Sequence, residues 1–152
     1  MCKFCWVLVV MLAALSGFLA FKFMVVGETE PSPDGRTAIV VTPQERDQIL
    51  LEMRMFVETV QTIIVANNAG DMNSIALATR EVGKAAQGQM SSVLVGKLPM
   101  GFKKLGFDTH SRFDQLGLDA EQQMSPEHIS QQLGALMGNC VACHKTYRLA
   151  TN

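Results

Sequence analysis

An uncharged apolar run at the N-terminus constrains this chain more than any other feature of its sequence. Lys3 precedes residues 4–20, which contain no charged residue, and residues 21–26 extend the run with Lys22 as the one interruption. A run of about 20 apolar residues is the length of a helix that spans a bilayer. We therefore expect residues 1–26 to form a transmembrane anchor that precedes the rest of the chain.

A cleaved signal peptide is the alternative interpretation of this run. Its cleavage site would follow Ala20, but Phe18 and Leu19 are poor residues before a cut, so an uncleaved anchor is favoured. Lys3 favours a cytoplasmic N-terminus, and Lys22 can extend its amine to the opposite interface. The remaining residues are then expected in the periplasm, attached to a bacterial inner membrane.

The rest of the chain divides into a linker and one domain. Residues 27–41 contain Pro31 and Pro33, which are turn formers, and residues 37–41 read as a short extended stretch. Residues 42–152 are long enough for one modest core. The chain has 13 Lys and Arg against 14 Asp and Glu, so its charge does not suggest a nucleic-acid partner.

Four helices are predicted in the domain, because apolar residues recur there at helical spacing. Two of them begin with a capping residue followed by proline, at Thr42-Pro43 and Ser125-Pro126. The expected ranges are 42–70, 71–86, 99–116 and 125–147, and residues 88–98 form the longest loop. Four helices with short connections predict an all-α fold, an antiparallel four-helix bundle with an N-terminal transmembrane helix.

The residues that carry chemistry are concentrated at Cys140-Val141-Ala142-Cys143-His144. The C-x-x-C-H pattern is the attachment signature of a c-type haem. Two thiols with two residues between them match the spacing of the haem vinyl groups, and the next His reaches the iron from the same side. On a helix, Cys140 and His144 share a face and Cys143 lies beside them. The motif predicts one covalent haem c with His144 as an axial iron ligand.

Other interpretations of these cysteines are weaker. A redox-active pair would lie at a helix N-terminus after a strand, a zinc site would need further ligands, and a disulfide between Cys140 and Cys143 would be strained on a helix. Cys2 and Cys5 lie at the other end of the anchor and are expected to be reduced thiols. No distal His with a neighbouring Arg suits a peroxidase, so the chain is not expected to be an enzyme.

A helical domain that ends in C-x-x-C-H and continues as Lys-Thr-Tyr-Arg over residues 145–148 resembles the class II cytochromes c, the cytochrome c′ and cytochrome c-556 group. The resemblance covers about residues 42–149. It implies a periplasmic haem protein, five-coordinate in the c′ branch and six-coordinate with Met in the c-556 branch. Members of the c′ branch usually lack a membrane anchor, and this chain departs from them there.

The resemblance also implies which residues flank the haem. In the family, an Arg on the first helix lies near a haem propionate, and the distal residue, Leu or Met, follows four residues later. Arg46 and Leu50 match that spacing. Leu50 would leave the iron five-coordinate, whereas Met53, one turn further along the helix, would supply a sixth ligand. His110 on the third helix is another alternative.

Two sets of cationic residues have possible roles beside a haem. Since buried carboxylates need cationic partners, the candidates for the haem propionates are Arg46, Arg54 and Arg148. A solvated face, or a docking site for an acidic redox partner, would be formed by Lys103, Lys104 and Arg112.

Two functions fit these observations. The first is one-electron transfer by a tethered cytochrome, and the second is nitric oxide or carbon monoxide binding at a five-coordinate haem. The anchor favours electron transfer, because tethering raises the local concentration of membrane partners. The expected partner is a membrane-associated redox protein, and a homodimer is left open.

Overall fold

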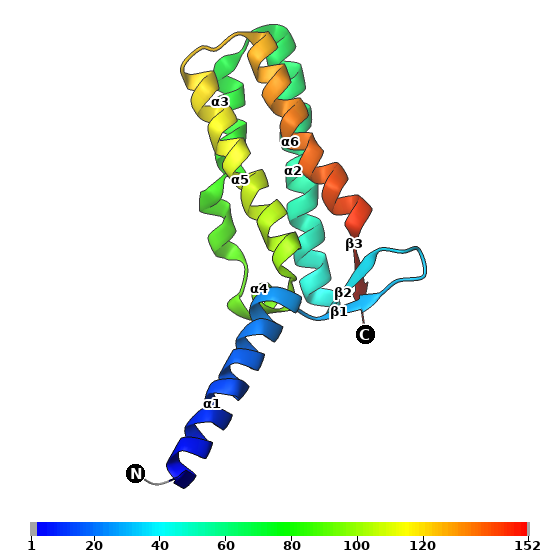
Figure 1. Cartoon of the computed structure of the whole chain (residues 1–152). Coiled ribbons are helices and arrows are strands. Elements are labelled where there is room, and N and C mark those ends of the chain that lie inside the picture. Colours follow the sequence, from blue (N-terminus) through cyan, green and yellow to red (C-terminus); the bar gives the residue numbers. More distant parts are fainter. Residues whose placement is uncertain (1–2, 152) are drawn as a thin grey trace.

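The computed structural model describes residues 3–151, except for the side chains of Gln87 and Gln89. Helices dominate the chain (Figure 1). The helices are α1 (Lys3–Phe21), the π-helical η1 (Lys22–Val26), α2 (Pro43–Ala69), α3 (Met72–Glu81), the short 3-10 helix η2 (Lys84–Gln89), α4 (Ser92–Lys97), α5 (Met100–Glu121) and α6 (Pro126–Thr146). The strands are β1 (Thr29–Pro31), β2 (Thr37–Val41) and β3 (Tyr147–Thr151).

α1 and η1 together form one apolar helix over Lys3–Val26 that is long and apolar enough to cross a membrane. Its most apolar stretch has no buried residue, and Figure 1 shows it projecting away from the other helices. A helix with these properties at the N-terminus is compatible with a membrane anchor and with a signal sequence.

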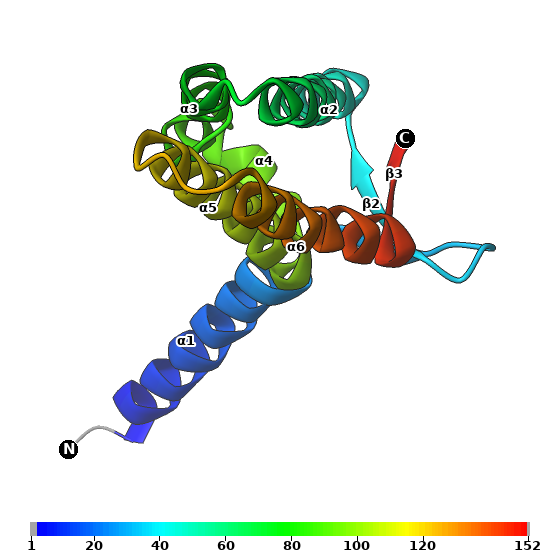
Figure 2. The ribbon, with the colours of Figure 1, turned by 90° about the horizontal axis from the view of Figure 1, so that it is seen from above.

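α2, α3, α5 and α6 pack around a shared core (Figures 1 and 2). α2 contacts α3 and α6, and α5 contacts the same two helices. The buried side chains of this first cluster include Phe56, Ile63, Ile75, Phe113, Leu116, Ile129, Leu133 and Leu136.

Local capping signals place α2 and α6 where the sequence predicts them. The Thr42 hydroxyl accepts the Glu45 N–H, and the Glu45 carboxylate accepts the Thr42 N–H at 2.8 Å, which is a complete capping box. Gly70, with a φ of 71°, ends α2 in the left-handed conformation. The Ser125 hydroxyl accepts the His128 N–H at the start of α6.

The prediction of an all-α chain holds only in part, because a three-stranded sheet ties the two ends of the domain together. β2 pairs antiparallel with β1 and parallel with β3, with Thr37 opposite Tyr147. The extended stretch expected over residues 37–41 is β2. The sequence did not predict β1 within residues 27–36, and Tyr147 begins β3 instead of extending the last helix. Pairing between segments so far apart leaves no local signal in the sequence.

The segment between α2 and α5 differs from the prediction in the length of its helix and in the structure of its loop. The second helix ends at Glu81, before the predicted residue 86, and the chain turns at Gly83. A Cβ on Gly83 would lie 1.9 Å from Oδ1 of Asp114, so a larger residue there would displace the Asp114 side chain. Within the predicted loop over residues 88–98, Ser91 caps the short helix α4.

A second apolar cluster lies among the sheet, α2, α4 and the start of α5. Its buried members are Ile39, Val41, Ile49, Leu94, Leu98 and Phe102. Met53 is half-buried and packs against both clusters.

Candidate functional site

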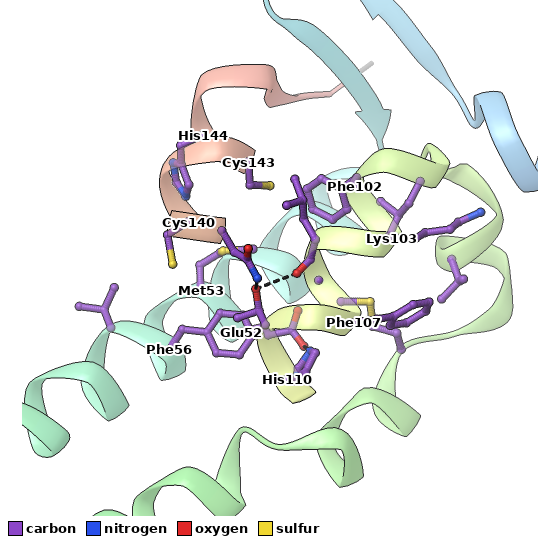
Figure 3. A pocket seen from close by; sticks show the side chains of 18 residues that line it. Glu52, Met53, Phe56, Phe102, Lys103, Phe107, His110, Cys140, Cys143 and His144 are labelled. Carbon is purple, nitrogen blue, oxygen red and sulfur yellow. Dashed lines mark hydrogen bonds and ion pairs between the residues drawn. The ribbon is translucent and has the colours of Figure 1, made fainter. Parts of the chain in front are cut away.

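A pocket opens between α2, α5 and α6 at the boundary of the two clusters (Figure 3). Its cavity volume is about 210 Å³, which is below the roughly 300–1,000 Å³ typical of ligand pockets. Its wall is mostly apolar, with Met53 and Phe56 from α2, Phe102 and Phe107 from α5, and Leu98 before α5. We call this the main pocket.

All three residues of the C-x-x-C-H motif line the main pocket from α6. Cys140 packs against the first cluster and Cys143 against the second, while His144 is exposed beside Cys140 (Figure 3). Residues at spacings of three and four share one face of a helix. The structure therefore has the helical setting and the common face that the sequence predicts for these residues.

The pKa values of both thiols are raised, which favours their neutral form. Burial raises the pKa of Cys140, and burial together with the neighbouring Cys140 raises the pKa of Cys143 to about 11. Both are free thiols near the C-terminal end of α6. Redox-active C-x-x-C pairs instead have lowered pKa values at helix N-termini. Among residues 3–151, no three His, Cys, Asp or Glu side chains converge to hold a metal ion by themselves.

The two distal candidates on α2 occupy different positions. Met53 lines the main pocket, and its side chain lies between α2 and the face of α6 that carries Cys140 and Cys143 (Figure 3). Leu50 does not line the main pocket but lines an adjoining one. Met53 therefore shares the main pocket with all three motif residues, whereas Leu50 shares the adjoining pocket with Cys143 and His144.

Arginines line the adjoining pocket, and each of them also lies within 3.8 Å of Asp34 or Asp47. Its cavity volume is about 240 Å³, and it shares Met53, Phe102, Cys143 and His144 with the main pocket. Three arginines line it and no carboxylate does, and these arginines are Arg36, Arg46 and Arg148. The sequence predicted Arg46 and Arg148 as anion partners, whereas Arg54 is exposed and lines neither pocket.

Arg36 is the site residue that sequence reasoning missed. Its Nη1 donates to the carbonyls of His144 at 3.3 Å and Tyr147 at 3.4 Å, and its Nη2 lies 2.7 Å from Oδ2 of Asp34. The Arg36 hydrogen bonds lower the pKa of Asp34, which also lies 3.8 Å from Arg148. The loop between β1 and β2 thus holds the end of the helix that carries the motif. No local pattern marks this role, because the two carbonyls that Arg36 binds lie more than a hundred residues away.

His110, the third distal candidate, is buried with both ring nitrogens engaged. Nδ1 lies 2.7 Å from the Val82 carbonyl, and Nε2 lies 3.3 Å from Oε1 of Glu52. Burial lowers the pKa of His110, but its bonds to Glu52 and to the Val82 carbonyl outweigh burial, so the net pKa is raised. His110 lines the main pocket, but it acts there as a hydrogen-bonded part of the wall.

The basic residues of α5 do not form one outward face. Lys103 is half-buried, and its Nζ donates to the carbonyls of Phe23 at 3.2 Å and Met24 at 3.4 Å. Arg112 pairs with Asp108 at 2.5 Å. Lys103 is therefore directed toward the apolar N-terminal helix and not toward a soluble partner.

No family model, curated protein sequence or solved structure matches this chain. The functional assignment therefore depends on the chemistry of the site. One face of α6 presents two thiols and an imidazole, α2 presents a thioether across an apolar pocket, and three guanidinium groups line the adjoining pocket.

Proposed function

We propose that this chain is a membrane-anchored c-type cytochrome of the class II kind, which transfers single electrons and has no enzymatic activity. In this proposal α2, α3, α5 and α6 form the antiparallel four-helix bundle of that class. One haem c is attached through Cys140 and Cys143, with His144 as an axial ligand. The observation that carries the proposal is that these residues and Met53 line one apolar pocket from two helices.

The residues present suit a haem. Its flat ring is apolar, which agrees with the wall of the main pocket, and the half-buried thiols of Cys140 and Cys143 lie at that wall. Its two propionates are anions that require cationic partners. The adjoining pocket offers Arg36, Arg46 and Arg148 for that role.

When bound, the haem supplies a one-electron iron couple. The protein residues set the properties of that couple: His144 and Met53 would ligate the iron, and an axial Met raises the reduction potential. The apolar wall limits the access of water, which also affects the potential. A gas-binding haem would need an open sixth position. Met53 lines both pockets and Leu50 only the adjoining one, which supports the carrier over a five-coordinate, gas-binding protein.

The proposal places the chain in a bacterial inner membrane with the domain in the periplasm. The helix over Lys3–Val26 would be the anchor, and the partner would be a membrane-associated redox protein. Tethering would hold the cytochrome at a high local concentration near such a partner.

Mass spectrometry of the chain matured in a bacterial periplasm tests the attachment. We expect the mass of one covalent haem, and we expect its loss when Cys140→Ala and Cys143→Ala are combined. Cys5→Ala is the matched control and should keep the haem. A mature wild-type chain without added mass would refute the proposal. The protein should also fractionate with membranes, and a soluble form that starts near Phe21 would refute the anchor.

A further inference from the structure

The apolar helix joins the domain without a flexible segment. Gly27 has a φ of +70°, and a Cβ at this position would lie 2.3 Å from the Lys97 carbonyl oxygen, so only glycine fits. The next residue, Glu28, donates its N–H to the same carbonyl at 2.7 Å and accepts the Val40 N–H at 2.9 Å. The backbone therefore passes from the helix directly into contacts with α4 and β2.

Two lysines strengthen this joint. Lys22 Nζ donates to the Gly27 carbonyl at 2.9 Å, and Lys103 Nζ donates to the carbonyls of Phe23 and Met24. Because the Phe23 and Met24 carbonyls lie in the last turn of the helix, the Lys103 amine satisfies acceptors that would otherwise lack partners. Lys103 also lines the main pocket, so the last turn of the apolar helix is bonded to the pocket wall.

The two ends of the domain differ in position and in charge. Figure 1 shows α1 leaving from the end that carries α4, the sheet and the end of α6, which we call the pocket end. The opposite, far end carries the α2–α3 and α5–α6 turns. Residues 27–47, 97–104 and 144–151 of the pocket end hold seven Lys or Arg and five Asp or Glu. Residues 66–76 and 117–130 of the far end hold four Asp or Glu and no Lys or Arg, and one of the four, Glu121, pairs with Arg80 from α3.

We propose that the pocket end of the domain lies against the membrane surface in one fixed orientation, in contact with anionic phospholipid headgroups. This inference rests on the anchor of the proposed function. The stiff joint sets the direction of the domain, and the charges favour the same direction, because an anionic surface attracts cations and repels the acidic far end within about 10 Å at 0.1 M salt. The main pocket then lies on the membrane side of the domain, where an electron-transfer partner must itself be membrane-bound.

Spin labels at the two ends test the orientation. The haem-loaded full chain would be placed in vesicles of phosphatidylcholine with phosphatidylglycerol. Cys2→Ser and Cys5→Ser remove two thiols that could react with the label. Cys140 and Cys143 would not react, because both would be bonded to the haem as thioethers. One label is attached at Val93→Cys, which lies on α4 and is 67% exposed. The other is attached at Asn73→Cys, an exposed position at the far end.

Nickel chelated to lipid headgroups should relax the label at position 93 strongly and the label at position 73 weakly. A flexible Gly-Ser segment inserted between Gly27 and Glu28 should make the two labels respond more nearly alike. Equal relaxation of the two labels in the native chain, or no effect of the insertion, would overturn the orientation.

The two proposals fail in different ways. A chain that reaches the membrane without haem would overturn the proposed function alone. The orientation would then be tested with the same two labels in a chain carrying Cys140→Ser and Cys143→Ser. A chain that loses its N-terminal helix in the cell would overturn the orientation as well.

Discussion

Met53→Leu separates an electron carrier from a gas-binding protein with little disturbance of the fold. Leucine nearly conserves the volume of methionine but lacks the thioether. Met53 is half-buried and packs against both apolar clusters, and a volume-conserving apolar exchange of this kind costs less than about 1.5 kcal/mol. For a domain of this size that cost lowers Tm by less than about 10 °C. The variant therefore stays folded at room temperature. A gross change in its haem spectrum would report lost ligation and not unfolding.

Optical and EPR spectra of the purified holoprotein provide the assay. If Met53 ligates the iron, the wild type should be low-spin in both oxidation states. Met53→Leu should then be high-spin when oxidised and should bind carbon monoxide when reduced. Its midpoint potential should fall by at least about 60 mV. For a one-electron couple this corresponds to a tenfold change in the equilibrium constant between the reduced and oxidised haem.

Met55→Leu is the matched control. Met55 lies two residues away on the same helix, is also half-buried, and packs against the first cluster, but it does not line the main pocket. Its exchange should lower Tm by a similar amount and leave the spectrum unchanged. A Met53→Leu protein that stays low-spin would refute Met53 as the ligand. A wild type that is high-spin would refute the carrier and support the gas-binding alternative.

Three further predictions concern the surroundings of the site. Arg36→Ala should destabilise the domain by about 1 kcal/mol, because two carbonyls at the end of α6 lose a donor; Arg54→Ala should stay within about 0.5 kcal/mol, and equal denaturation midpoints would contradict the role of Arg36. The pKa of His110 is raised in the folded state, so its stabilising contribution is complete below its unfolded pKa of about 6.5 and is lost as pH rises through the folded value. Urea midpoints measured across that range should fall as pH rises, and a slope that Glu52→Gln leaves intact would exclude the pair as its cause. His144→Ala should retain the covalent haem but change the visible spectrum grossly, and an unchanged spectrum would mean that another residue ligates the iron.

Local signals in the sequence were sufficient for the elements that present the motif. The capping box at Thr42 and the serine cap at Ser125 place the starts of α2 and α6, since caps and helical periodicity depend on residues within a few positions. The same periodicity places Cys140, Cys143 and His144 on one face. Their roles toward a haem remain predictions for the experiments above.

Tertiary structure alone decided which other side chains lie beside Cys140, Cys143 and His144. Leu50 and Met53 are neighbours on one helical face, and the sequence does not distinguish them; the packing of α2 against α6 places only Met53 in the main pocket. Arg36 reaches His144 because β2 pairs with β3. Contacts between residues a hundred positions apart arise from how the whole chain closes its core, and the local pattern around either partner carries no record of them.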